Sequence, residues 1–207
     1  MIEISFPDKS VRSYEKGVTP LDIAQSISEG LARNVISASF NDNTFEASTP
    51  IMEDGFIKLY TWNDKEGKAA FWHSSAHILA QSLISKYPQA KLTIGPAIEN
   101  GFYYDVDFGD ASFSEKDLPS LEEQFLIFAR EKFEFKMRMS SKSDALKFYQ
   151  KENNPYKIEL IENLEDGTIS FCDHADFTDL CRGGHIPHSG FIKAVKLLSI
   201  AGAYWRG

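Results

Sequence analysis

The chain has 207 residues, of which 43% are hydrophobic and 25% are charged, and its formal net charge at pH 7 is −8. These proportions are typical of a globular protein and exclude a disordered chain. The acidic charge argues against a protein that binds nucleic acid over its whole surface. The two cysteines, Cys172 and Cys181, are too few for a disulfide framework. Folded sequence begins at Ile2 without a signal peptide, and no apolar run approaches the length of a membrane span, so we expect a cytoplasmic protein.

Residues 1–62 carry the signals of a small mixed domain. The turn residues Pro7-Asp8-Lys9 separate two stretches of alternating apolar and polar residues, which is typical of a hairpin. Thr19 is a suitable N-cap, and Pro20 suits the first position of a helix. The expected elements are a hairpin at 2–6 and 11–14, a helix from Pro20 to Gly30, and strands at 35–40, around Phe45 and at 57–61. This order predicts a small β-grasp (ubiquitin-like) domain, in which the helix packs across one mixed sheet.

The polar stretch 63–68 separates this domain from a second one. The alternating run from Phe133 to Met139 predicts a strand with one buried face, and Asp117 is the expected cap of a helix at 118–131. The other expected elements are helices at 71–87 and 143–149 and strands at 102–107, 156–161, 168–172 and 192–200. Helices packed against a largely antiparallel sheet predict an α+β domain over residues 63–207.

Two short motifs contain the residues best suited to chemistry. In the first, His73 and His77 lie four residues apart, so both rings project from one face of the expected helix. In the second, Cys181 and His185 are also four residues apart, and the two glycines between them allow a tight backbone turn. We expect the two motifs to meet in one polar pocket.

These four side chains permit three kinds of chemistry. Three histidines and a cysteine are ligands of the type that zinc prefers. Alternatively, Cys181 acts as a nucleophile activated by a histidine, or the group positions substrate and water without a metal. The residue after His73 is Ser74, where zinc peptidases with two helical histidines need a glutamate, so that class is excluded. On spacing alone, each pair is also compatible with a purely structural role.

Five separated motifs help to decide between these kinds of chemistry, because they point to one protein family. Gly17–Ala24, His73–His77, Gly101–Asp105, Asp179–His185 and Ala201–Gly207 occur in this order and at matching spacing in one family. On these residues, the chain resembles the N-terminal part of bacterial threonyl-tRNA synthetases over essentially its whole length.

The resemblance implies that residues 1–62 form a TGS-type domain and residues 63–207 the editing domain that threonyl- and alanyl-tRNA synthetases share. The implied activity is that of an aminoacyl-tRNA deacylase, the editing part of a threonine--tRNA ligase, which hydrolyses serine from mischarged threonine tRNA. Serine lacks one methyl group of threonine, which is worth only ~1–3 kcal/mol in a binding pocket, so a second site must remove the error. The implied partner is the acceptor end of threonine tRNA carrying serine, with no membrane involved.

The resemblance also implies which parts lie outside this chain. The aminoacylation core, with its ATP, magnesium and zinc, and the anticodon-binding domain are expected beyond Gly207, in a full-length enzyme that is a homodimer. No cofactor is expected within the 207 residues. If the editing site does use zinc, as its alanyl relatives do, the implied ligands are His73, His77, Cys181 and His185.

Roles follow from the resemblance residue by residue. It implies that His73 orients or activates the hydrolytic water, that Lys157 stabilises the oxyanion, and that Asp179 binds the amino group of serine. The other implied site residues are His77, Cys181 and His185 in the catalytic pocket, Tyr104 and Arg182 in substrate binding, and Arg182, Lys193 and Lys196 at the tRNA phosphates. Family members usually have proline at the position of Gly184, which implies a more flexible loop here.

Two alternatives to metal-independent editing stay open. One is a zinc-dependent trans-editing deacylase of the alanyl type. The other is a non-catalytic module that only binds tRNA. His188 belongs to none of the matched motifs and is expected at the surface.

Overall fold

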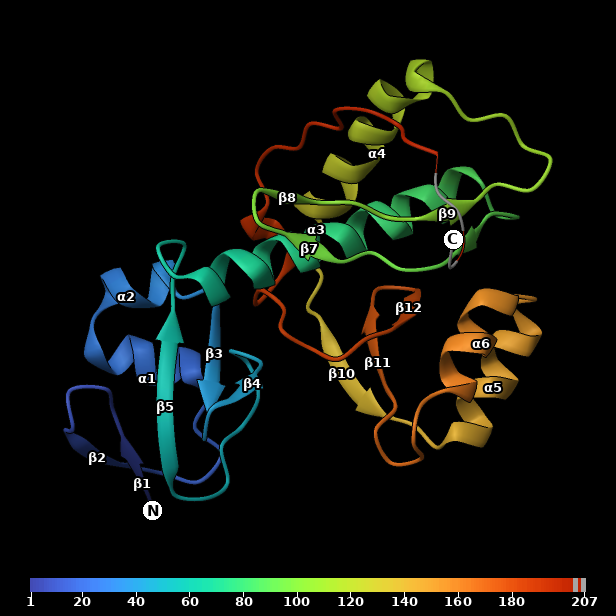
Figure 1. Cartoon of the computed structure of the whole chain (residues 1–207). Coiled ribbons are helices and arrows are strands. Elements are labelled where there is room, and N and C mark those ends of the chain that lie inside the picture. The colour runs from blue at the N-terminus through green and yellow to red at the C-terminus, as the bar shows by residue number, and fades with distance from the viewer. Residues whose placement is uncertain (203–204, 206–207) are drawn as a thin grey trace. The chain divides into compact units, whose positions relative to one another are not determined.

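The structure, a computed structural model, describes residues 1–202 and 205 (Figure 1). The chain forms two compact units, of which the first comprises residues 1–74 with 183–188 and the second the remaining described residues. Within the described part, none of the helices is long and apolar enough to cross a bilayer. The predicted domain boundary after residue 62 stays a prediction.

A five-stranded sheet with the order β2-β1-β5-β3-β4 forms the first unit. Its strands are β1 (Ile2–Ser5), β2 (Val11–Tyr14), β3 (Ser37–Phe40), β4 (Asn43–Phe45) and β5 (Gly55–Tyr60). β1 pairs antiparallel with β2, with Ile2 opposite Tyr14, and parallel with β5, with Ile4 opposite Gly55. This mixed sheet confirms the predicted hairpin and the β-grasp class.

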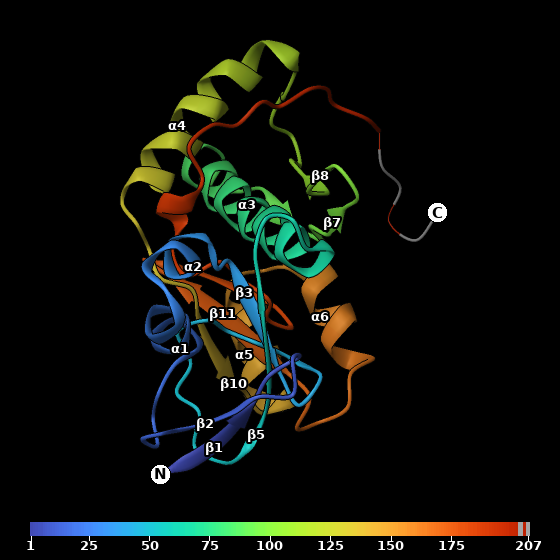
Figure 2. The ribbon, with the colours of Figure 1, turned by 90° about the vertical axis from the view of Figure 1, so that its left-hand side faces the viewer.

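Helices α1 (Pro20–Ile27) and α2 (Glu29–Asn34) lie beside this sheet (Figure 2). The predicted start of α1 is confirmed, because the Thr19 side chain accepts a hydrogen bond from the Asp22 backbone in a capping box. The predicted end at Gly30 is wrong. Ser28 has extended dihedral angles and its side chain caps α2, so one expected helix becomes two.

Helix α3 (Lys65–Lys86) begins six residues earlier than the predicted start at Phe71. Gly67, which had indicated a linker, lies inside this helix. A Cβ atom on Gly67 would lie 2.0 Å from the carbonyl oxygen of Thr61, so only glycine allows the first turn to pack against the end of the preceding segment.

The second unit combines helices with small antiparallel sheets. Its main sheet has the order β10-β11-β12, and the pairs β6-β9 and β7-β8 form two short ladders. The strands are β6 (Lys91–Leu92), β7 (Ala97–Ile98), β8 (Gly101–Phe102), β9 (Val106–Asp107), β10 (Lys136–Met139), β11 (Ser170–His174) and β12 (Phe177–Leu180). Together with the helices, they confirm the predicted α+β class.

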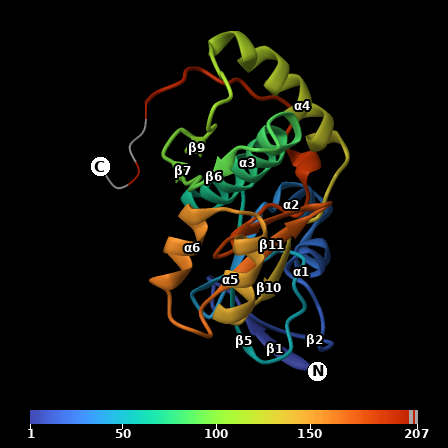
Figure 3. The same ribbon diagram turned by 90° about the vertical axis from the view of Figure 1, so that its right-hand side faces the viewer.

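Three α-helices accompany these strands, namely α4 (Leu118–Arg130), α5 (Lys142–Lys151) and α6 (Pro155–Glu162), together with the short 3-10 helices η1 (Glu115–Asp117) and η2 (Ser189–Phe191). Figure 3 shows α5 and α6 beside β10 and β11. Their shared core contains Tyr149, Ile161 and Phe171, which are at most 4% exposed. Asp117 does not cap α4 as predicted, because its carboxylate accepts hydrogen bonds from the backbone and side chain of Ser114.

The predicted strand at 156–161 is wrong, because these residues form helix α6. Asn154 accepts a hydrogen bond from the backbone N–H of Lys157, and Pro155 occupies the first turn, so a helix start precedes the apolar residues. Lys157 and Ile161, four residues apart, are the buried positions of this helix.

Two further strand predictions need correction. Residues 192–200 form no strand, and the backbone N–H of Leu197 donates instead to the carboxylate of Glu122 on α4. The expected strand at 102–107 is divided into the ends of β8 and β9, which pair with different partners. Tyr104 lies in the interruption, so its side chain is not held in a regular ladder.

Candidate functional site

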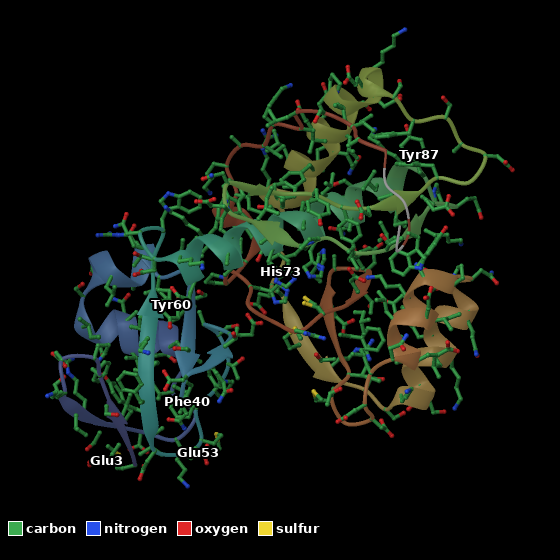
Figure 4. All side chains as sticks on the ribbon, in the orientation of Figure 1. Glu3, Phe40, Glu53, Tyr60, His73 and Tyr87 are labelled. Atoms are coloured by element: carbon green, nitrogen blue, oxygen red, sulfur yellow. The ribbon has the colours of Figure 1, made fainter. Side chains whose placement is uncertain are left out.

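Helix α3 places the histidines of the first motif one turn apart, as predicted. The His77 side chain is buried and 3% exposed, whereas His73 is half-buried and labelled in Figure 4. The ring centroids of His73 and His185 lie 4.7 Å apart with an interplanar angle of 31°. The two predicted motifs therefore meet at these imidazoles.

The second motif begins at the end of β12 and continues into a loop. Gly183 and Gly184 have φ angles of 91° and 89°, which glycine adopts without strain, but residues 181–186 form neither a turn nor a bend, so the predicted tight turn is not found there. Proline has φ near −65° and no N–H, so it could not adopt the conformation of Gly184. A proline at position 184 is therefore incompatible with this backbone conformation.

Asp179 is the centre of a buried hydrogen-bond network in the second unit. Its Oδ1 accepts from Lys157 Nζ at 2.5 Å, from Tyr149 Oη at 3.2 Å and from its neighbouring backbone N–H, that of Leu180, at 2.8 Å. Its Oδ2 accepts from Tyr104 Oη at 2.5 Å, and His77 Nδ1 lies 3.9 Å from the same oxygen. A carboxylate has about four acceptor positions, so these donors satisfy it.

Lys157 comes to this network from α6 and is only 3% exposed. A lysine is rarely buried without a partner, because desolvation of an ammonium group is costly unless an opposite charge compensates for it. Lys157 and Asp179 form such a pair, with side chains that are 4% and 5% exposed. Lys157 is thus not a solvated surface lysine. It lies on helix α6 rather than on the predicted strand, and it still contacts Asp179.

The tyrosines around Asp179 are kept protonated. Burial, followed by the nearby charge of Asp179, raises the pKa of Tyr104 and the pKa of Tyr149 well above the usual value of 10.0. Both hydroxyl groups therefore act as hydrogen-bond donors toward the carboxylate at neutral pH.

The raised tyrosine pKa predicts that the free energy of unfolding falls above pH 10. Above this pH, the phenol of Tyr149 ionises in the unfolded protein but stays neutral in the folded protein. Each such tyrosine therefore lowers the free energy of unfolding by up to ~1.4 kcal/mol per pH unit. Urea unfolding at pH 8 and at higher pH should show a smaller loss for Tyr149→Phe than for the unchanged chain. Tyr103→Phe, at a side chain that is 43% exposed, is the control and should leave the loss unchanged. Equal losses in Tyr149→Phe and the unchanged chain would contradict the prediction.

Gly95 allows the ring of Tyr104 to reach Asp179. A Cβ atom on Gly95 would lie 2.2 Å from Cδ2 and 2.4 Å from Cε2 of that ring. The ring contacts the glycine backbone directly, and a side chain at position 95 would displace it.

We expect Gly95→Ala to lower the free energy of unfolding by about 1–3 kcal/mol, because the displaced ring strains a packed region. The shift would also weaken the hydrogen bond from Tyr104 to Asp179. Urea unfolding measures the first effect. Gly202→Ala is the matched control, since nothing lies within 4 Å of its added Cβ. Equal unfolding midpoints in the two variants would show that the Tyr104 ring is not held as described.

Glu46 holds the loop of the second motif within the first unit. Its Oε1 accepts a hydrogen bond from the backbone N–H of Gly184 at 2.9 Å and lies 3.0 Å from His185 Nδ1. Its Oε2 accepts from the backbone N–H of His185 at 3.0 Å. His185 is completely buried.

Sequence reasoning missed several of these residues. Glu46 is a single acidic residue in a loop, and Tyr149 has the spacing of an ordinary core position on α5. His174, on β11, is 2% exposed, and its ring centroid lies 5.9 Å from that of His77. None of these residues stands in a motif, and only contacts across long sequence separations reveal them.

The four residues predicted as possible zinc ligands are divided between the two units. His73 and His185 belong to the first unit, and His77 and Cys181 belong to the second. Three imidazoles and a thiol are donor types that zinc prefers, and a carboxylate beside a ring nitrogen, as Glu46 lies beside His185 Nδ1, is a common partner of a metal-bound histidine. The donor types therefore suit a zinc ion.

The three residues predicted to contact tRNA phosphates differ in their exposure and in their partners. Arg182 is exposed. Lys196 lies 3.1 Å from Glu122, and Lys193 donates to the backbone carbonyl of Gly190. His188 is half-buried rather than fully at the surface. Ala203, Tyr204, Arg206 and Gly207 of the last motif lie outside the described residues.

Comparisons with known proteins agree with the resemblance. Residues 2–61 match the TGS domain family, and residues 169–204 match the family described as Threonyl and Alanyl tRNA synthetase second additional domain. The chain is 63% identical to the threonine--tRNA ligase of Flavobacterium psychrophilum, 62% to that of Flavobacterium johnsoniae and 55% to that of Cytophaga hutchinsonii.

Each of these alignments covers 100% of this chain but 32% of the relative, so the chain spans about a third of the length of the curated relatives it matches. The predicted resemblance is confirmed. Residues 2–61 are thus similar to TGS domains and residues 169–204 to the threonyl and alanyl tRNA synthetase second additional domain, and along its whole length the chain is similar to the N-terminal region of bacterial threonine--tRNA ligases.

Proposed function

We propose that this chain is the editing part of a threonine--tRNA ligase and hydrolyses the ester between serine and threonine tRNA. The observation that carries this proposal is the buried network of Asp179, Lys157 and Tyr104, with His77 beside it. A buried ammonium group held by a carboxylate and a phenol is costly to fold and is typical of a site that stabilises charge.

In the proposed reaction, water attacks the carbonyl carbon of the seryl ester while His73 orients it and accepts its proton. His73 suits this role because it is half-buried, whereas His77 and His185 are buried. The ammonium group of Lys157 stabilises the oxyanion of the tetrahedral intermediate. Collapse then breaks the bond to the ribose oxygen, which takes up a proton, and releases serine and tRNA with a free hydroxyl group.

Asp179 has two roles in this proposal. Its carboxylate keeps Lys157 and Tyr104 in place, and it also attracts the amino group of the bound serine. Because its oxygens already accept hydrogen bonds from Lys157, Tyr104 and two further donors, an arriving ammonium group must replace one of them. Tyr104 and Arg182 would bind substrate, and Cys181 and His185 would complete the pocket near the terminal ribose.

Zinc-dependent deacylation is the second candidate, and the donor types of the four residues, three imidazoles and a thiol, favour it. When bound, zinc would activate water as a nucleophile and would be held by His73, His77, Cys181 and His185. Metal analysis of the chain purified without chelators distinguishes the two candidates. One zinc per chain, with activity lost on chelation and restored by zinc, would replace the metal-independent proposal.

The direct test is deacylation by the 207-residue chain of threonine tRNA charged with serine, compared with the same tRNA charged with threonine. We expect release of serine that far exceeds release of threonine, because the pocket must exclude the extra methyl group. Binding of the tRNA without turnover would instead support the third candidate, a non-catalytic tRNA-binding module.

For a full-length ligase, we further propose ATP- and magnesium-dependent aminoacylation, a zinc site in the catalytic core, a homodimer and a cytoplasmic location. The editing chain itself would need no ATP, since ester hydrolysis is favourable without an energy source.

A further inference from the structure

The structure places one carboxylate of the β-grasp part against the loop that carries His185. Glu46 lies directly after β4, and 139 residues separate it from His185 along the chain. Both stretches belong to the first compact unit. A residue of the stretch that matches the TGS domain family, Glu46, therefore contacts the candidate site residue His185.

We infer that Glu46 is a positioning residue, which holds His185 in the tautomer with its proton on Nδ1. The inference rests on the proposed editing function for its role in catalysis, but the tautomer itself follows from the contacts. An ionised carboxylate only accepts hydrogen bonds. The ring nitrogen 3.0 Å from Glu46 Oε1 must therefore donate, and this nitrogen is Nδ1.

The two backbone contacts fix the carboxylate in this orientation. The N–H groups of Gly184 and His185 can only donate, and they reach the two different oxygens of Glu46 at 2.9 and 3.0 Å. These bonds join a charged acceptor to donors in a region of low exposure, since the side chains of His185 and Glu46 are 0% and 11% exposed. Charge-assisted bonds are stronger there than in water.

The consequence concerns the other ring nitrogen. With the proton on Nδ1, a neutral His185 presents Nε2 as an acceptor, either for a proton during hydrolysis or for a metal ion. His73 lies beside this ring, with a centroid separation of 4.7 Å. Glu46 thus determines that Nε2 of His185, rather than Nδ1, is the nitrogen available as an acceptor, although Glu46 itself does not touch the substrate.

The tautomer can be measured without any activity assay. We would label the histidine rings of the whole chain with ¹⁵N and record NMR spectra of the unchanged protein, Glu46→Ala, Glu46→Gln and Glu53→Ala. We expect His185 of the unchanged protein and of Glu53→Ala to carry its proton on Nδ1. Glu46→Ala should shift it toward Nε2, and Glu46→Gln should retain the Nδ1 proton because its carbonyl oxygen still accepts.

Glu53 is a suitable control because it is an exposed glutamate of the same unit, and Figure 4 shows it at the end away from His73. A proton on Nε2 in the unchanged protein would overturn the inference. So would an unchanged His185 spectrum in Glu46→Ala. If Glu46→Ala does not fold, Glu46→Asp provides the same comparison, because its shorter side chain withdraws the carboxylate from the ring.

Kinetics test the role in catalysis. Removal of the outer partner of a metal-bound histidine typically costs roughly 10- to 100-fold in activity, and we take the same order for the orienting partner of His185. We expect this loss in kcat for serine release by Glu46→Ala, with KM nearly unchanged and with partial recovery in Glu46→Gln. An unchanged kcat would overturn the positioning role. If the unchanged protein shows the Nδ1 tautomer but no hydrolysis, the proposed function fails while the assignment of the tautomer stands.

Discussion

Lys157→Met is expected to lower the free energy of unfolding by about 3 kcal/mol or more, because it leaves the carboxylate of Asp179 buried without its charged partner. Both side chains are at most 5% exposed. Tyr104, Tyr149 and the backbone N–H of Leu180 still donate to Asp179, so we expect the lower end of the range for a broken buried pair. Urea unfolding at pH 7 measures the loss.

A second ion pair in the same unit provides the control. Lys196 and Glu122 lie 3.1 Å apart, but their side chains are 69% and 15% exposed. Pairs with an exposed member contribute ~0–1 kcal/mol, so Lys196→Met should have little effect. Similar losses in the two variants would show that removal of Lys157 does not leave a costly unpaired charge on buried Asp179.

The double variant Lys157→Met with Asp179→Asn separates stability from chemistry. Replacement of both charges removes the unpaired group, so the double variant should be more stable than the sum of the single effects predicts. Serine release should nevertheless stay as low as in Lys157→Met, because the cation that stabilises the oxyanion is absent. Recovery of activity together with stability would exclude a direct role for Lys157.

His73→Ala is expected to lower kcat for serine release by ~10²-fold or more, which is the usual contribution of a general base. KM should change little, because His73 acts on water rather than on the tRNA. Single-turnover deacylation at saturating enzyme measures the chemical step. The ring contact with His185 would also be lost, so circular dichroism must show that the variant is folded.

Glu66→Ala is the matched control for this variant, since Glu66 is an exposed residue of the same helix. It should retain the full rate. Equal rates for His73→Ala and the unchanged chain would withdraw His73 from catalysis. His77 would then be the next candidate, because it lies 3.9 Å from Asp179 and one turn further along α3.

Local signals predicted much of the fold. The hairpin of β1 and β2 was predictable because its alternation and turn residues act over a few positions, and the capping box at Thr19 identified the start of α1. The same reasoning fails for α6, because a short apolar stretch is compatible with either a strand or a helix and the helix start at Asn154 lies just before it. Residues 192–200 also have strand-like composition, but a strand needs a partner, and Glu122 on α4 holds them instead.

Residue types and spacing alone identify which side chains can do chemistry and which of them are neighbours along the chain, because helix periodicity acts within one or two turns of backbone. They predict the placement of His73 and His77 one turn apart on one helix. The partners of these side chains depend instead on how distant segments pack. Asp179 meets Tyr104 across 75 residues, and His185 meets Glu46 across 139. Such contacts arise because buried charged and polar groups must be satisfied, and the group that satisfies them depends on how distant segments pack.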